Sequence, residues 1–159
     1  MNLLNIVPAW LAILLSILLA AAAVQDIMVR KISNLLVLAT LIAGVAAMVV
    51  MGPQVRLWQN FLVFAVLLVL GVFAYARNVL GAGDVKLFAA TALWTDLAGA
   101  PRLVAAILIA GGVLALLMLG RVVIGRKKMD EGMRKRRSVP YGVAIAAGAL
   151  LILWYGRVG

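Results

Sequence analysis

The chain has 159 residues, of which 67% are hydrophobic and 13% are charged, and its mean hydropathy is +1.17. So little charge excludes an ordinary soluble globular domain. The absence of Cys and His from the sequence excludes thiol catalysis, histidine acid–base catalysis, disulfides and the usual zinc ligands. The net charge of +10 falls mostly in one short loop between apolar runs, which is typical of membrane topology and not of nucleic-acid binding.

Six apolar runs follow one another along the chain and predict an all-α, polytopic bundle of six transmembrane helices in a single domain, residues 1–159. The runs are Ile6–Val24, Leu35–Met51, Phe61–Ala76, Val85–Ala98, Leu103–Ile124 and Val139–Tyr155. The first superficially resembles a secretory signal, but no Lys or Arg precedes it and it is long enough to span, so we expect an uncleaved helix. The fourth is the weakest candidate, because a straight span needs about 20 residues.

The distribution of basic residues predicts the orientation of this bundle. If all six runs cross, the first, third and fifth loops share one side and hold twelve of the 15 Lys and Arg residues, eight of them from Arg121 to Arg137. The positive-inside rule then places these loops in the cytoplasm and both termini outside. The four tryptophans would fall near the outer interface, where indoles prefer to lie. They are Trp10, Trp58, Trp94 and Trp154.

Two aspartates fall on the cytoplasmic side of this topology. Asp26 follows the first apolar run, and Asp84 belongs to a Gly-Ala-Gly-Asp sequence just before the fourth. An ionisable group beside a membrane span is energetically expensive and therefore indicates a functional site. Asp96 would lie at the opposite face, while Asp130 and Glu131 lie in the basic loop. By elimination, Asp26 and Asp84 are the candidate catalytic pair.

Two carboxylates held close together share a proton, because both cannot ionise easily in a low-dielectric site. The ionised member can deprotonate water and the protonated member can hydrogen-bond the scissile carbonyl, as in aspartic proteases. Gly81 and Gly83 would allow a tight turn and close approach of a substrate backbone. The alternative is that these glycines only mark a loop and that Asp84 caps the next helix.

Two further polar residues near the aspartates have open roles. Asn34 is expected to N-cap the second helix. Lys86 could favour the ionised carboxylate or steer substrate charge, or its side chain could simply snorkel to lipid phosphate.

Three motifs resemble those of the type IV prepilin peptidases, a branch of the intramembrane GxGD aspartyl proteases. The stretch GAGDVKLFAA, from Gly81, resembles the second active-site motif. The segment from Asp26 through Arg30, Lys31, Ile32 and Asn34 is similar to the first, in which an Asp precedes basic residues and an Ile-Pro-Asn triplet. The closing segment with Pro140 and Gly142 resembles a Pro-x-Gly stretch at the last helix. Ser33 stands where the family usually has Pro.

The resemblance implies that Asp26 and Asp84 are catalytic, that Gly81 and Gly83 are motif glycines, and that Lys86, Asn34, Pro140 and Gly142 support the site. It implies cleavage of a short basic leader after a glycine, at the cytoplasmic face of a bacterial inner membrane. The partner would be a prepilin or pseudopilin with a hydrophobic stem helix, and no metal, cofactor or nucleic acid is expected.

Larger members of that family carry a cytoplasmic domain with a cysteine tetrad and N-methylate the product. This sequence has no Cys, so it looks like the compact branch that serves tight-adherence (Flp-type) pili. The oligomeric state is left open.

Three alternatives to this interpretation remain. A presenilin-type or signal-peptide-peptidase-type GxGD protease usually has Tyr before the first Asp, where this chain has Gln25, and more spans. A non-catalytic ion or proton carrier would need polar groups across the membrane depth. A pilus assembly scaffold could retain the motifs without activity.

Overall fold

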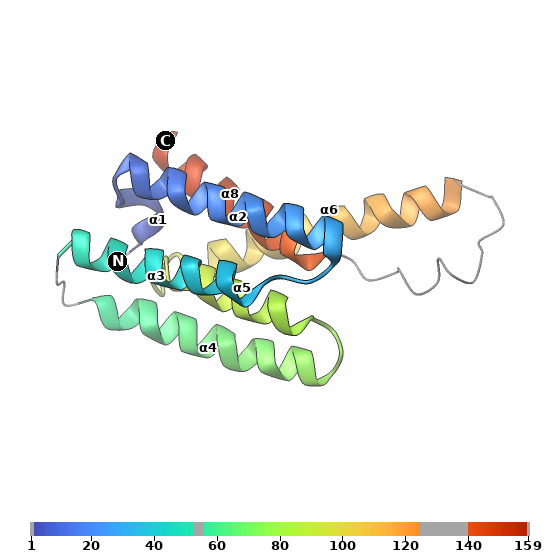
Figure 1. The fold of residues 1–159 in the computed structure, drawn as a ribbon, viewed down its shortest axis with the longest axis horizontal. Coiled ribbons are helices and arrows are strands. Elements are labelled where there is room, and N and C mark those ends of the chain that lie inside the picture. Colours follow the sequence, from blue (N-terminus) through green and yellow to red (C-terminus); the bar gives the residue numbers. More distant parts are fainter. Residues whose placement is uncertain (1, 53–55, 125–139, 159) are drawn as a thin grey trace.

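The computed structural model describes residues 2–52, 56–124 and 140–158, and its regular structure there is entirely helical. The expectation of an all-α chain is therefore confirmed for this part. The helices, in chain order, are α1 (Leu3–Ile6), α2 (Ala9–Val29), α3 (Asn34–Val50), α4 (Leu57–Ala76), α5 (Ala82–Ala92), α6 (Ala100–Ile124) and α8 (Tyr141–Val158) (Figure 1). The basic loop Arg126–Arg137, with Asp130 and Glu131, lies outside the described residues.

Three of these helices are long and apolar enough to cross a membrane. They include α2, α4 and residues Ala100–Gly120 of α6, while α3 and α8 are shorter apolar helices. α5 has only 11 residues, which at about 1.5 Å per residue is roughly half of a bilayer core. Each predicted run thus overlaps a helix, but the fourth run does not form one straight span of its own.

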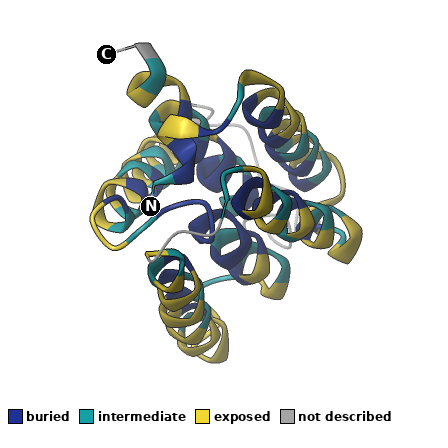
Figure 2. Ribbon diagram, turned by 90° about the vertical axis from the view of Figure 1, so that its left-hand side faces the viewer, coloured by how far each residue is buried: buried dark blue, intermediate teal, exposed yellow. Residues whose placement is uncertain are grey.

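The outer surface of the bundle is apolar. Figure 2 shows buried residues facing the centre and exposed residues facing outward on the helices. Large apolar side chains such as Ile17, Leu108 and Leu116 are 60%, 69% and 69% exposed. A continuous surface of this kind is unfavourable in water and suits contact with lipid.

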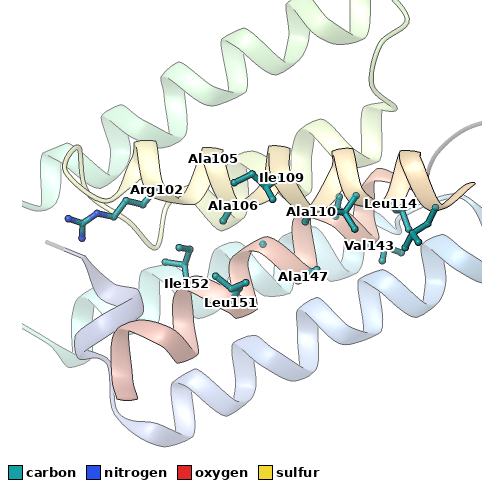
Figure 3. A pocket seen from close by; sticks show the side chains of 14 residues that line it. Arg102, Ala105, Ala106, Ile109, Ala110, Leu114, Val143, Ala147, Leu151 and Ile152 are labelled. Carbon is teal, nitrogen blue, oxygen red and sulfur yellow. The ribbon is translucent and has the colours of Figure 1, made fainter. Parts of the chain in front are cut away.

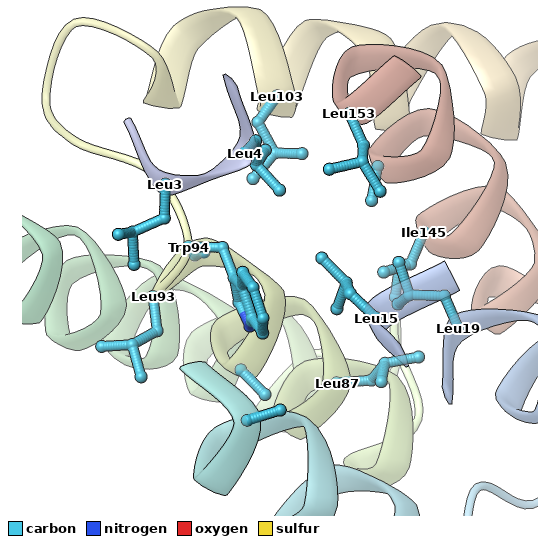
Figure 4. Close-up of a cluster of buried hydrophobic side chains, with 14 of the residues drawn as sticks. Leu3, Leu4, Leu15, Leu19, Leu87, Leu93, Trp94, Leu103, Ile145 and Leu153 are labelled. Atoms are coloured by element: carbon cyan, nitrogen blue, oxygen red, sulfur yellow. The ribbon is translucent and has the colours of Figure 1, made fainter. Parts of the chain in front are cut away.

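The short helix α5 ends in the core, where α1 covers it. Trp94, just after α5, is fully buried and lies among Leu3, Leu4, Leu15 and other apolar side chains (Figure 4). The Leu4 N–H donates to the Trp94 carbonyl over 3.2 Å, which joins α1 to the end of α5. Because of its indole N–H, a buried Trp needs an acceptor, and Trp94 Nε1 donates to the carbonyl of Thr40 over 3.3 Å.

The depth expected for the four tryptophans, near the outer interface, stays a prediction, but Trp94 does not face the surroundings of the bundle because its indole is fully buried. Trp10, Trp58 and Trp154 are 56%, 58% and 44% exposed, as lipid-facing residues should be. Trp94 differs because α5 is too short to carry it beyond the bundle, so its indole packs against neighbouring helices.

Close packing sets the position of α5 within the bundle. A Cβ added to Gly71 of α4 would lie 2.6 Å from Val85 Cγ1, so this glycine allows α5 to approach. At the other end of α5, Asn60 of α4 donates from Nδ2 to the Leu93 carbonyl over 3.0 Å. The α2–α3 and α4–α5 loops lie at one end of the bundle and both termini at the opposite end (Figure 1). The two predicted active-site segments therefore lie at the same end.

Candidate active site

Asp26 lies in the last turn of α2 and is 5% exposed. Its Oδ2 accepts the N–H of Gly142, in the first turn of α8, over 2.8 Å. The first N–H groups of a helix have no partner within the helix and carry a partial positive charge, so they favour an anion. The start of α8 thus holds the Asp26 carboxylate in place.

The loop after Asp26 is held by its own hydrogen bonds. Arg30 ends α2 in the left-handed region (φ 54°), and its N–H donates to the Asp26 carbonyl over 2.9 Å. The Ser33 N–H donates to Gln25 Oε1 over 2.8 Å. A proline at this position, as the related motif usually has, could not make this bond because it lacks the N–H.

The predicted N-cap at Asn34 is wrong, because the cap is Ser33. The Ser33 hydroxyl oxygen accepts the Leu36 N–H over 3.3 Å, and Asn34 is already the first residue of α3. A hydroxyl placed directly before the helix competes successfully for this position. Asn34 instead accepts a hydrogen bond from Lys86 Nζ over 3.0 Å, so its side chain links α3 to α5.

Asp84 lies in the first turn of α5, where Gly81 is the N-cap. Its Oδ2 accepts the Gly81 N–H over 3.2 Å, so the carboxylate does contribute to the start of the helix. Burial, followed by the negative charge of Asp26, raises the pKa of Asp84 to about 6, and hydrogen bonds from the Gly81 and Gly142 amides offset part of this rise. The two carboxylates therefore interact, and the Gly142 amide acts on both.

Three glycines allow the segments of the site to meet. A Cβ on Gly83 would lie 3.1 Å from Ile32 Cβ, and one on Gly142 would lie 2.8 Å from both Ile32 Cδ1 and Asp26 Oδ2. A Cβ on Gly81 would lie 2.8 Å from Asp84 Oδ2. The α2–α3 loop, the start of α5 and the start of α8 are thus packed around Ile32 and Asp26 at backbone distance.

A cleft of about 380 Å³ lies between the end of α2, the α2–α3 loop and the start of α5. It is lined by Asp26, Arg30, Lys31, Ile32, Asn34, Gly81, Ala82, Gly83, Asp84 and Lys86. Both carboxylates line the same space, as two residues that act on one bound peptide must. Within the described parts of the chain, no three Asp or Glu side chains gather into a group that could hold a metal ion.

Two residues that the sequence analysis considered, Pro140 and Asp96, do not line the cleft. Pro140 directly precedes α8, and its carbonyl accepts the Val143 N–H over 3.2 Å. Asp96 lies in the turn between α5 and α6, where its Oδ1 accepts the Gly99 N–H over 2.9 Å. It does not line the cleft.

Sequence reasoning missed the supporting role of Gln25 and the function of the Gly142 amide. Gln25 has no sequence signal beyond its place beside Asp26, because its bond to Ser33 depends on how the loop folds back. Gly142 was expected only as part of a Pro-x-Gly stretch. Its partner Asp26 lies 116 positions earlier in the chain.

A larger groove of about 610 Å³ lies between α6 and α8 (Figure 3). Among the residues that the structure describes, its lining is almost entirely apolar, with Arg102 as the one charged residue and no carboxylate. The carboxylates that acid–base chemistry would need, those of Asp26 and Asp84, lie in the smaller, polar cleft.

Residues 13–120, more than half of the chain, match the Type IV leader peptidase family. The match includes both aspartates and the Gly-Ala-Gly-Asp sequence, and it ends before Pro140 and Gly142. Searches of curated proteins and of solved structures found no match. Together with its helical, lipid-suited surface, the match shows that this chain belongs to the type IV leader peptidase family.

Proposed function

We propose that this protein is a GxGD-type aspartyl endopeptidase that removes the short basic leader of Flp-type prepilins or pseudopilins. Family membership supports a leader-peptidase-like activity. The observation that carries the aspartyl mechanism is the shared cleft, in which Asp26 from α2 and Asp84 from α5 interact electrostatically and lie near one amide, that of Gly142.

In this mechanism the two carboxyl groups hold one proton between them, and the pair titrates as a unit. The ionised group takes a proton from water, whose oxygen attacks the scissile carbonyl carbon. The protonated group gives its proton to the carbonyl oxygen. The resulting diol collapses, the C–N bond breaks, and the leaving amine receives a proton from the pair. No covalent intermediate with the protein is needed.

The proposed location is the bacterial inner membrane, with six crossings, both termini outside and the cleft facing the cytoplasm. The α2–α3 loop carries Arg30 and Lys31, and Arg77 and Lys86 flank the α4–α5 turn at the same end of the bundle. Basic residues at one end favour the cytoplasmic side. In this orientation the leader would reach the dyad from the cytoplasm while the stem helix stays in the lipid.

A proton or ion carrier is less well supported. The buried hydroxyls of Thr40 and Thr91 donate to carbonyls of their own helices over 2.9 and 2.8 Å. The side-chain amide of Asn60 donates to the Leu93 carbonyl. These polar groups satisfy nearby backbone groups, as hydroxyls in membrane helices often do, and do not continue the polar lining of the cleft across the bundle.

The test is co-expression with a Flp-type prepilin in a host that lacks its own prepilin peptidase. We expect the wild type to produce mature pilin, and Asp26→Asn and Asp84→Asn to produce none at equal membrane abundance. Asp96→Asn is the matched control, since it changes an aspartate outside the cleft, and should process normally. Wild-type processing by either cleft variant would disprove the dyad. No processing by a well-expressed wild type would reject this activity on this substrate.

A further inference from the structure

The groove between α6 and α8 carries its one charged lining residue at one end. Arg102 and Ile152 lie at that end, and Leu114 and Val143 lie at the other (Figure 3). Val143 directly follows Gly142 of the active site, so Arg102 marks the end of the groove that is away from the cleft. Between these ends the described lining is apolar. The groove therefore has the polarity of an amphiphile, with a charge at one end and hydrocarbon along its length.

The Arg102 side chain is available to bind an anion. It is exposed and extends past the end of the groove (Figure 3). Within the described part of the chain, its guanidinium has no hydrogen-bond or ion-pair partner, whereas Arg157 donates to the Val7 carbonyl over 2.8 Å. A guanidinium presents a planar set of donors that matches a phosphate group.

The size of the groove favours a hydrocarbon chain over another helix. From Arg102 to Leu117 the groove follows α6 for about 22 Å, at about 1.5 Å per residue. One leaflet supplies about 15 Å of the hydrocarbon core, so the acyl chain of a lipid whose headgroup lies at Arg102 fits within this length. A helix of the same length and about 10 Å in diameter would occupy about 1,700 Å³, well beyond the groove volume of about 610 Å³.

We propose that this groove binds one phospholipid, whose phosphate pairs with Arg102 and one of whose acyl chains lies between α6 and α8. The headgroup would lie in the leaflet opposite the cleft. The inference depends on the place of the chain in a bilayer and not on the peptidase activity. Only 6% of the candidate span of α6 is buried, and α6 packs mainly against α8. A bound acyl chain would therefore contact both helices and stabilise their pairing.

Two exposed residues allow the groove and its charge to be changed separately. Ala147 of α8 lines the groove and is exposed, so Ala147→Leu fills part of the groove without entering the core. Ala65 of α4 is also exposed and does not line the groove, so Ala65→Leu is the matched control. Arg102→Gln removes the charge. Its control is Arg56→Gln, which changes an exposed arginine at the start of α4.

The experiment measures lipid binding to the purified full chain by native mass spectrometry. The probes are dioleoyl phosphatidylglycerol, diolein, which has the acyl chains without the phosphate, and glycerol phosphate, which has the phosphate without the chains. We expect the wild type to bind one phosphatidylglycerol, to bind diolein about tenfold more weakly, as loss of a charged hydrogen bond predicts, and not to bind glycerol phosphate. Phosphatidylglycerol should also raise the midpoint of unfolding, because it binds only the folded chain.

The variants should divide these effects. Arg102→Gln should bind phosphatidylglycerol only as well as diolein, and Ala147→Leu should bind both lipids about tenfold more weakly than the wild type. Ala65→Leu and Arg56→Gln should bind as the wild type does.

Unchanged phosphatidylglycerol binding in Arg102→Gln or in Ala147→Leu would overturn the inference. Glycerol phosphate binding as tight as that of the phospholipid would overturn it too, and would leave Arg102 as a site for free phosphate. A wild type that binds no lipid but forms a dimer, which Ala147→Leu abolishes, would assign the groove to a second copy of the chain. None of the four variants changes a residue of the cleft, so each of these results leaves the proposed peptidase activity to its own test.

Discussion

Replacement of Gly142 by Ala tests whether the start of α8 positions the dyad. The new Cβ would lie 2.8 Å from Asp26 Oδ2 and from Ile32 Cδ1, and 3.0 Å from Asp26 Cβ. Both neighbours are nearly buried, at 5% and 9% exposure, so neither can swing freely aside. The first turn of α8 must therefore retreat, and the 2.8 Å bond between the Gly142 N–H and Asp26 must lengthen.

The expected losses of stability and of kcat follow from these contacts. Overpacking of a core typically costs about 1–3 kcal/mol of folding free energy, which still allows the protein to insert. A displacement of about 1 Å at a catalytic group can cost about 100-fold in rate. We therefore expect Gly142→Ala to lower kcat about 100-fold with little change in KM.

The assay compares purified Gly142→Ala with Gly120→Ala, whose added Cβ meets no atom within 4 Å. A pH profile separates positioning from general destabilisation. The Gly142 amide lowers the pKa of Asp84, so its withdrawal should move the fall in activity to higher pH. A Gly142→Ala enzyme within twofold of the control, with an unmoved pH profile, would refute the role assigned to this amide.

Three further predictions concern the cleft and the loop that follows Asp26. Because the pKa of Asp84 is raised to about 6, Asp84 is protonated below that pH and ionised above it, so kcat/KM should fall as the pH rises above about 6. A kcat/KM that climbs through the neutral range would contradict a shared proton. Gln25→Ala removes the acceptor of the Ser33 N–H and should lower the free energy of unfolding by about 1–3 kcal/mol. The measurement is the midpoint of unfolding in detergent, which should be lower than in the wild type. An unchanged midpoint would argue against this bond. EDTA should leave kcat unchanged, because in the proposed mechanism Asp26 and Asp84 supply the acid and the base. An inhibition that added metal reverses would reject this mechanism.

Local sequence patterns predicted the helices well but their ends less well. The first apolar run stops at Val24, where hydropathy falls, yet α2 continues to Val29 and ends at the left-handed Arg30. Backbone hydrogen bonds can extend a helix past its last apolar residue, and this extension places Asp26 on a rigid turn. Ser33 as the cap of α3 could also have been read from the sequence, since Ser is a preferred cap.

The sequence by itself determined that the chain is an all-helical bundle suited to lipid, and that Asp26 and Asp84 are the acids to consider. Long apolar runs and the placement of Lys and Arg are local properties that every bundle of this kind must share. Only the tertiary structure decided that α5 is short, that Trp94 is buried, and that the Gly142 amide reaches Asp26 across 116 positions. Hydropathy cannot make these distinctions, because lipid and protein interior are both apolar, and which of them a side chain meets depends on how the helices pack.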